Sequence, residues 1–424
     1  MRANALFSQG SNLEHRLILV AIFLFALLVR VVVIDATVGF STPAAVEPAA
    51  DSRIHIAIVQ SLLEGKGYRF DGKRTAITPP LYIFFLAGLY RVFHSPEFIR
   101  LIQAVIGAVG CILLFEIGRR MLGYATGLVA ALVLSVHPLA AYLAGLHLTE
   151  SLFLFLVLLI LYQSLRVAER PTTGATLLLG ALVGFAALTR AVFLGFLPFV
   201  VVWTASVWGI RAPSTYRTFA LVVVGTIAVL TPWTIRNYLA LGAVVPVQSN
   251  GGVVFWAGNN PSADGGLVWP THTTWTAGPP PDDGNYGWQG LSLTAANRRY
   301  VETAWAWIRQ HPHEYERLLV RKLTRLVGFS RAMNEADVRV PKTVGVFQVA
   351  FLTAALLGFV LSTRRWRPLV LPFGLIAFTL VATLIFSGAT RYTVPMVPSL
   401  CLLAAVPLTT RWFQPQPTRV PGSV

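Results

Sequence analysis

Long apolar stretches separated by short polar segments dominate the pattern along this 424-residue chain. A helix needs roughly 20 apolar residues to cross a bilayer. About ten stretches meet or approach that length, at residues 17–34, 98–117, 122–143, 152–165, 177–188, 192–208, 219–234, 345–361, 369–386 and 394–408. The pattern therefore predicts an all-α polytopic membrane protein built as a bundle of about ten transmembrane helices.

The predicted number of spans is ten give or take about two, because a run of 10–14 apolar residues also fits a buried helix. The pair 177–188 and 192–208 is the most ambiguous, since only the segment around Arg190 separates the two runs.

Composition and charge agree with a membrane protein. The chain is 55% hydrophobic and 12% charged, whereas an ordinary soluble domain is about 25% charged. The net charge is +16, which in a soluble protein would suggest nucleic acid. Here arginines fall in every second short connection, at 119–120, 166–170, 211–217 and 364–367. This bias marks cytoplasmic loops, so we expect both chain ends in the cytoplasm, a multi-pass protein of the cytoplasmic membrane, and no nucleic-acid partner.

That topology divides the chain into six parts and leaves two long segments outside the cytoplasm. Residues 1–35 hold the cytoplasmic N-terminus and first span, and 98–240 form the transmembrane core. The remaining parts are the first extracytoplasmic loop 36–97, the second extracytoplasmic loop 241–343, the C-terminal spans 344–411 and a cytoplasmic tail 412–424. Long loops on a rigid scaffold commonly carry function.

The first loop predicts two short helices. Residues 52–64 place Ile54, Ile58 and Leu62 on one face, which is typical of a helix lying on the membrane surface. Residues 78–93 are apolar but short and begin with two prolines, so they fit an interfacial or re-entrant helix.

The second loop has two halves. Residues 244–286 are rich in Gly, Pro, Asn and Trp, and predict irregular structure with short strands. Residues 295–329 predict a helix broken near Pro312. Its flanking basic residues suit anionic headgroups; they are Arg317, Arg321, Lys322 and Arg325.

Other polar features are read as structural. Cys111 and Cys401 lie inside predicted spans and are expected to be small core residues rather than a disulfide or metal pair. The first run carries Arg30 and has no cleavage site, so it predicts a retained anchor.

Ionisable groups at the outer ends of the spans are the candidates for function, since such groups are costly near membrane depth. Carboxylates serve as a general base or hold a divalent cation, and arginine binds phosphate through its rigid fork. Together they indicate a lipid-linked phosphate substrate. The candidates are Asp51, Glu150 with His147, Arg190, Arg236 with Asn237, and Arg391 with Tyr392.

Each candidate also has a structural interpretation. Asp51 could serve simply as the N-cap of the helix after it, and Glu150 could simply complement a helix dipole. Arg236 and Arg391 could simply extend their side chains to the lipid headgroups. The loop histidines show no metal-ligand spacing with an acid, so the sequence assigns no metal site.

Several stretches, in this order, resemble the GT-C superfamily of polyprenyl-phosphate-sugar glycosyltransferases, near the bacterial protein O-mannosyltransferase and aminoarabinose transferase group. These are ADSRIHIAIVQSLLEGKGY from residue 50, TPPLYIFFLAGLYRVF from 78, LHLTESLFLFLVLL from 146, TPWTIRNYLALG from 231 and RYTVPMVPSLCLLAA from 391.

The resemblance implies an inverting glycosyltransferase acting at the outer face of the membrane. It would move a hexosyl or pentosyl group from a polyprenyl-phosphate carrier to a glycolipid, glycan or protein acceptor. Asp51 would be the general base or position the acceptor, Glu150 would be the second catalytic acid, and Arg236 and Arg391 would meet the carrier phosphate. Asn237, Tyr392, Arg190 and His55 join the expected substrate contacts.

Two differences between this chain and the aminoarabinose transferases limit which of their functional properties the resemblance implies here. Aminoarabinose transferases have a Glu-Lys pair before the Pro-Pro, where this chain has Ile77 and Thr78. The aromatic residue common after the loop acid is also missing, with His55 in its neighbourhood. These differences argue against that particular sugar and leave open whether Mg²⁺ or Mn²⁺ takes part.

Three other functions remain open at this stage: a ligase using diphosphate-linked oligosaccharide, a flippase or transporter for lipid-linked sugars, and a scaffold without chemistry. A transporter usually shows two halves of similar pattern, and none is visible here. Loss of turnover in Asp51→Asn with lipid binding kept would favour catalysis.

Overall fold

The computed structural model describes residues 12–43, 46–47, 50–269, 292–328, 342–363 and 366–409. The predicted tail 412–424, and the parts of the second loop at 270–291 and 329–341, lie outside the described residues.

All of the predicted apolar runs are helical, and seven helices among the described residues are long and apolar enough to cross a membrane. The chain is therefore a nearly all-helical polytopic membrane protein, as predicted. The span-sized helices are α1 (Asn12–Thr37), α4 (Pro96–Leu122), α7 (Glu150–Glu169), η2 (Ala191–Phe196) with α9 (Leu197–Trp208), α10 (Pro213–Leu241), α14 (Lys342–Ser362), and η4 (Arg367–Leu369) with α15 (Val370–Ile385). Shorter apolar helices are α5 (Tyr124–Val136), α8 (Thr173–Thr189) and α16 (Val397–Thr409).

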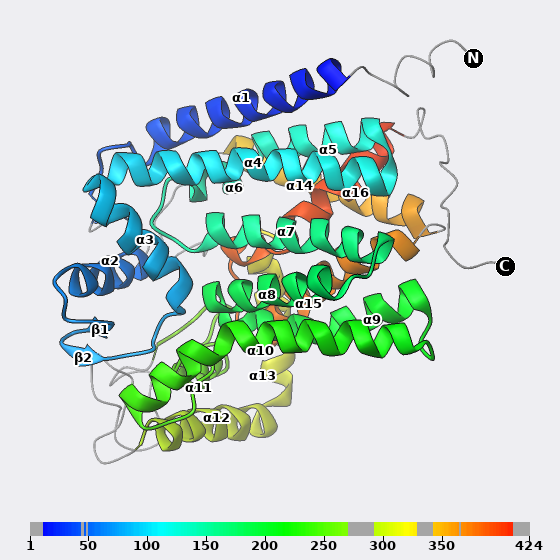
Figure 1. Ribbon diagram of the computed structural model, residues 1–424. Helices are drawn as coiled ribbons and strands as arrows, with labels where there is room; N and C mark the ends of the chain where they lie inside the picture. Colours follow the sequence, from blue (N-terminus) through cyan, green and yellow to red (C-terminus); the bar gives the residue numbers. More distant parts are fainter. Residues whose placement is uncertain are drawn as a thin grey trace, which may run out of the picture.

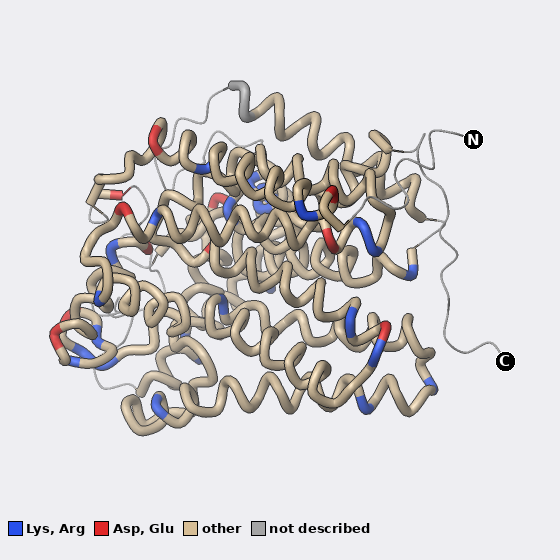
Figure 2. The backbone as a smooth tube through the Cα atoms, turned by 45° about the horizontal axis from the view of Figure 1, so that its top comes forward, with Lys and Arg blue, Asp and Glu red and all other residues tan. Residues whose placement is uncertain are grey.

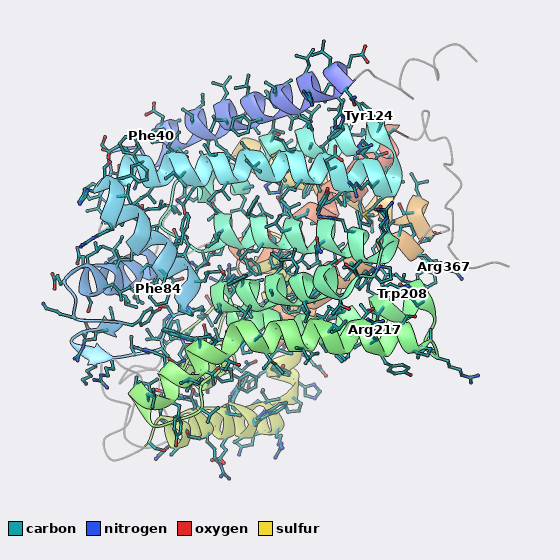
Figure 3. All side chains as sticks on the ribbon, viewed as in Figure 1. Phe40, Phe84, Tyr124, Trp208, Arg217 and Arg367 are labelled. Atoms are coloured by element: carbon teal, nitrogen blue, oxygen red, sulfur yellow. The ribbon has the colours of Figure 1, made fainter. Side chains whose placement is uncertain are left out.

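The span helices lie side by side, and the long segments between them gather at one end of the bundle (Figure 1). At that end lie α2 (Ala50–Leu63), β1 (Arg69–Phe70), β2 (Lys73–Arg74), α3 (Pro80–Phe93), α11 (Gly251–Ala257) and α12 (Leu293–Gln310). Figure 3 places Phe40 and Phe84 at this end, and Trp208, Arg217 and Arg367 at the opposite one. We call the end that carries α2 and α3 the loop end.

Basic residues lie at both ends of the bundle. Figure 2 shows Lys and Arg at the turns of the end opposite the loop end, and a second basic group at the loop end, around the β1–β2 hairpin. Apolar side chains on the outward faces of the spans are exposed, for example Leu28 (60%) and Val224 (55%). Such surfaces suit lipid rather than water.

The predicted surface helix of the first loop exists as α2, but its apolar face packs on protein rather than on the membrane surface. Ile58 and Val59 are 0% and 1% exposed and lie in a core cluster with Tyr82, Ile83 and Trp233. The expectation of a headgroup-facing stripe was therefore wrong at these positions. These side chains pack instead on α3 and on Trp233 of α10.

The second loop confirms one prediction and corrects two. The helix does break near Pro312, into α12 and α13 (Pro312–Leu326), with His311 between them. The predicted short strands are not found at 244–269, where the structure has the seven-residue helix α11 instead. Two of the basic residues expected to face headgroups, Lys322 and Arg325, are 0% and 8% exposed and face protein.

Close helix crossings at glycine hold the bundle together. A Cβ on Gly180 of α8 would lie 2.2 Å from the Val222 carbonyl oxygen of α10, and one on Gly225 would lie 2.4 Å from the Leu177 carbonyl oxygen. Thr226 Oγ1 donates across the same crossing to the Gly180 carbonyl at 3.0 Å. Small residues are the usual way for membrane helices to approach this closely.

Gly180→Ala should therefore destabilise the protein by about 1–3 kcal/mol, because the new methyl group forces the two backbones apart. Thermal unfolding in detergent measures the change. Gly174→Ala, in the same helix, is the control, because a Cβ there meets nothing within 4 Å. Equal melting temperatures for the two variants would contradict the argument that this crossing needs glycine.

Candidate active site

Asp51 and Arg391 form the first of two ion pairs at the loop end. Asp51 lies in the first turn of α2, and Arg391 lies in the short 3-10 helix η5 (Thr390–Thr393) that follows α15. Arg391 Nη2 lies 2.8 Å from Asp51 Oδ2. The Asp51 side chain is 45% exposed while Arg391 is 19% exposed. The carboxylate is therefore paired but still open to a molecule entering from outside.

Glu150 and Arg190 form the second pair, with Arg190 Nη1 3.0 Å from Glu150 Oε1. Glu150 is 3% exposed in the first turn of α7. Arg190 caps the C-terminus of α8 in extended backbone, so the break between α8 and η2 aims its side chain at the loop end. The guanidinium carbon lies 5.3 Å from the Tyr392 ring centroid and 5.7 Å from that of Phe153.

Tyr392 joins the two pairs. The guanidinium carbons of Arg190 and Arg391 both lie 5.3 Å from its ring centroid. We call Asp51, His55, Glu150, Arg190, Arg391 and Tyr392 the carboxylate–arginine cluster. The structure thus brings together six of the nine residues that the sequence singled out, from four separate parts of the chain.

The charges within this cluster act on each other. Burial raises the pKa of Asp51, but the charge of Arg391, its hydrogen bond to the carboxylate and the charge of Arg190 outweigh burial and leave that pKa below its ordinary value. Asp51 is therefore a carboxylate near neutral pH. It can accept hydrogen bonds from a hydroxyl or stabilise a positive charge.

A buried network of hydrogen bonds and an ion pair supports the cluster from the protein interior. The sequence did not reveal this network. Arg100 Nη2 lies 2.7 Å from Glu47 Oε1, and both side chains are fully buried. The other Glu47 oxygen accepts from the His147 backbone N–H at 2.9 Å, while His147 Nδ1 lies 2.6 Å from Oε1. Tyr90 Oη lies 3.0 Å from His147 Nε2. His147 was expected beside Glu150, whereas its own side chain belongs to this network.

A small cavity lies beneath Glu150 and is walled by Arg30 of α1. Its volume of about 20 Å³ suits a single water, and its lining includes Gly107, Gly110 and Ser151. Arg30 is 1% exposed, with its guanidinium bonded to the Ala26 carbonyl and to Cys111 Sγ. The Arg30 side chain, noted in the first apolar run of the sequence, therefore points into the interior of the helix bundle. Cys111 and Cys401 are free and buried, as expected.

Arg236 and Asn237 lie in a different place from the cluster. Arg236 donates to the backbone carbonyls of Thr75 and Tyr68 at 2.7 and 3.0 Å. It lines a hollow of about 490 Å³ together with Lys66, Arg69 and Arg74. We call this the basic hollow. Its α10 wall is apolar and outward-facing, with Ile235 54% and Leu239 74% exposed.

Asn237 is fully buried, and both ends of its amide are used. Its Nδ2 donates to the Val245 carbonyl at 2.8 Å, and its Oδ1 accepts from Arg236 at 3.1 Å. These bonds fix Asn237 at the end of α10, and its substrate contact stays a prediction.

Lys322 of α13 ties the second loop to the spans. Its Nζ donates to Asn259 Oδ1 at 2.7 Å and to the Leu384 carbonyl at 3.0 Å, and burial lowers its pKa to about 7. Thr390 Oγ1, next to Arg391, donates to the Arg325 carbonyl at 3.3 Å. The second loop is thereby fastened to the segment that presents Arg391.

The donor groups of the cluster do not fit a divalent cation. Among the described residues no group of three or more His, Cys, Asp and Glu side chains is arranged to hold a metal ion. Asp51 and Glu150, the two acids that Mg²⁺ or Mn²⁺ would use, each form an ion pair with an arginine, at 2.8 and 3.0 Å. The positive charge beside both carboxylates is supplied by arginine.

Comparisons with known proteins support the resemblance seen in the sequence. Residues 78–235 match the family model described as dolichyl-phosphate-mannose-protein mannosyltransferase. No curated protein matches the chain.

Solved structures of archaeal oligosaccharyltransferase share the fold. The Archaeoglobus fulgidus oligosaccharyltransferase in its apo form superposes with a TM-score of 0.58 at 12% identity, covering 95% of this chain and 51% of that one. The archaeal oligosaccharyltransferase AglB from Archaeoglobus fulgidus, in complex with an inhibitory peptide and a dolichol-phosphate, gives a TM-score of 0.52 at 11% identity, covering 93% and 50%. ArnT from Cupriavidus metallidurans bound to undecaprenyl phosphate gives 0.45 at 16%, covering 93% and 77%.

The present chain spans about half the length of the oligosaccharyltransferase that it matches. At these identities the likeness to the solved structures is one of fold. Together with the family-model match at residues 78–235, this likeness confirms the resemblance: the chain is a polytopic membrane protein with the GT-C fold.

Proposed function

We propose that this protein transfers a sugar, with inversion at the anomeric carbon, from a polyprenyl-phosphate carrier to an extracytoplasmic acceptor at the outer face of the cytoplasmic membrane. The observation that carries the proposal is the carboxylate–arginine cluster, in which Asp51 is ion-paired and yet 45% exposed at the loop end. An open carboxylate beside fixed arginines suits a reaction in which a hydroxyl attacks and a phosphate leaves.

The carrier needs a cationic site for its phosphate next to an apolar surface for its chain. The basic hollow offers both, since Lys66, Arg69, Arg74 and Arg236 line it beside the exposed apolar face of α10. Arg391 and Arg190 offer a second cationic site inside the cluster. We assign the reacting phosphate to Arg391 and Arg190, and the sugar to the space above the carboxylates that they contact.

The chemistry is a single displacement. The acceptor oxygen forms a bond to the anomeric carbon while the bond from that carbon to the phosphate oxygen breaks. The electron pair leaves with the phosphate, so negative charge develops on the carrier. Arginines held in place before the reaction stabilise that charge without having to reorganise. Asp51 and Glu150 orient the acceptor hydroxyl.

Names among the relatives support this choice of substrate class. The matching family is named for dolichyl-phosphate-mannose and for protein acceptors. The archaeal neighbour was solved with a peptide and a dolichol-phosphate. A protein, a glycan or a glycolipid each remains a suitable acceptor for this chain.

Transfer from a panel of labelled polyprenyl-phosphate sugars tests the proposal. Membranes holding the protein should move label from at least one donor into an acceptor fraction, and control membranes should not. A protein that moved intact lipid-linked sugar between leaflets without cleaving it would instead be a flippase. Label transferred only from diphosphate-linked donors would point to a ligase.

A further inference from the structure

His55 lies one turn after Asp51 on α2 and is 4% exposed. The proposed transfer needs an atom that removes the acceptor hydroxyl proton. Asp51 is poorly suited to that step, because Arg391 lies 2.8 Å from its carboxylate and its pKa is below the ordinary value. A base works best when its pKa lies near the operating pH, so a different group of the cluster is a better candidate.

The structure defines which nitrogen of His55 carries the proton. His55 Nδ1 lies 2.9 Å from the backbone carbonyl oxygen of His147. A carbonyl oxygen can only accept, so Nδ1 is the N–H donor in this contact. A neutral imidazole has one donor and one acceptor nitrogen, which leaves Nε2 with the lone pair. Within the described part of the chain no side chain or backbone group bonds to Nε2.

The ring is held firmly in this orientation. Tyr82 packs against it edge to face, with the ring centroids 5.4 Å apart. The carbonyl that accepts from Nδ1 is itself fixed, because Glu47 binds the backbone N–H and the ring of the same residue, His147. Arg100 holds Glu47 in turn, at 2.7 Å. The buried network therefore fixes the tautomer of His55.

The charged groups around His55 come from three elements. Asp51 lies on its own helix, Glu150 on α7 and Arg391 on η5. Burial lowers the pKa of His55 below 6.5, with a smaller contribution from Arg391, while Asp51 and Glu150 oppose that shift. The imidazole is thus neutral at pH 7, and two carboxylates are in place to stabilise the imidazolium once it forms.

We infer that His55 Nε2 accepts the acceptor's hydroxyl proton and that Asp51 and Glu150 act by orienting the hydroxyl and stabilising the imidazolium. This inference rests on the proposed function. In the step, the O–H bond breaks and its proton moves to Nε2. The oxygen bonds to the anomeric carbon, and the carbon–oxygen bond to the carrier phosphate breaks. The proton on Nε2 then passes to solvent.

His55→Asn is the direct test, because the Asn amide can still donate to the His147 carbonyl but offers no basic nitrogen. Transfer should fall by about 10²–10⁴-fold, with the KM for the lipid donor and the melting temperature little changed. The matched control is His137→Asn. His137 is also buried, and its Nδ1 accepts from the Ala140 N–H as the N-cap of α6 (Pro138–Leu143), which Asn can replace.

The wild-type pH profile provides a second readout that does not depend on any variant folding. With His55 as the base, kcat/KM should fall as the pH drops through a midpoint below 6.5, because burial lowers the pKa of His55. That acid limb should persist in His137→Asn and vanish from the residual activity of His55→Asn.

Two results overturn the inference while leaving the proposed function intact: transfer by His55→Asn at the wild-type rate, or an acid limb that persists unchanged in the residual activity of His55→Asn. Failure of the wild-type protein to transfer sugar from any polyprenyl-phosphate donor would instead refute the proposed function, and this inference with it.

Discussion

Asp51→Asn should lower sugar transfer by about 10²–10³-fold while the protein stays folded, the size of loss seen when a fixed electrostatic group is removed from an active site. Asparagine keeps the shape of the side chain and can still accept a hydrogen bond from Arg391, which in the wild-type protein lies 2.8 Å from the Asp51 carboxylate. It removes the negative charge that orients the acceptor and stabilises the charged form of His55. Initial rates with a labelled donor, together with donor binding, measure the effect.

Asp71→Asn is the matched control for this substitution. Asp71 is exposed in the turn between β1 and β2 and has a positive φ of 47°, a conformation that Asn adopts readily. Its transfer rate should equal that of the wild type. Equal rates for Asp51→Asn and Asp71→Asn would show that the carboxylate in the cluster is not part of the reaction.

Arg100→Met should destabilise the protein by about 3–5 kcal/mol, because it leaves the Glu47 carboxylate buried without a compensating charge. Both side chains of this pair are fully buried, and Arg100 also donates to the Gly145 and Phe40 carbonyls. Thermal unfolding in detergent measures the loss. The His147 segment loses part of its support in the same variant, so transfer should fall as well.

Two comparisons separate the ion pair from the loss of a long side chain. Arg91→Met removes an exposed arginine from α3 and should leave the melting temperature unchanged. The double variant Glu47→Gln/Arg100→Met removes both charges and should recover part of the stability, since an uncharged amide is cheaper to bury. A double variant no more stable than Arg100→Met would contradict an account based on the unpaired charge.

Much of the fold could be predicted because membrane helices leave a strong local signal. A run such as 98–117 needs little information beyond its own hydropathy, and the interruption at Arg190 marks the end of α8. The break before Pro312 was equally visible, because proline removes a backbone donor and clashes with the preceding turn.

The candidate site was predicted in part, through residue type and position at the ends of spans. Asp51, Glu150, Arg190 and Arg391 stood out because ionisable groups near membrane depth are rare, and the structure brings them together. Arg236 met the same criterion but lines the basic hollow, because its guanidinium is bonded to the first-loop carbonyls of Thr75 and Tyr68.

The supporting network could not be seen in the sequence, because its contacts are long-range. Glu47 lies in a segment without helical pattern and meets a partner 53 residues away in Arg100 and another 100 residues away in His147. Lys322 looked like a headgroup contact because its helix is basic and amphipathic, and only the packing against Asn259 and Leu384 reveals its inward direction.

The lipid product of the reaction tests the central claim most directly. Purified protein in liposomes, given the polyprenyl-phosphate sugar that the donor panel identifies, should release free polyprenyl monophosphate in step with glycosylated acceptor, as weighed by mass spectrometry. The Asp51→Asn protein should release about 10²–10³-fold less over the same time. Lipid that stays fully glycosylated in the presence of acceptor, or equal release by the two proteins, would contradict a glycosyl transfer carried out at this cluster.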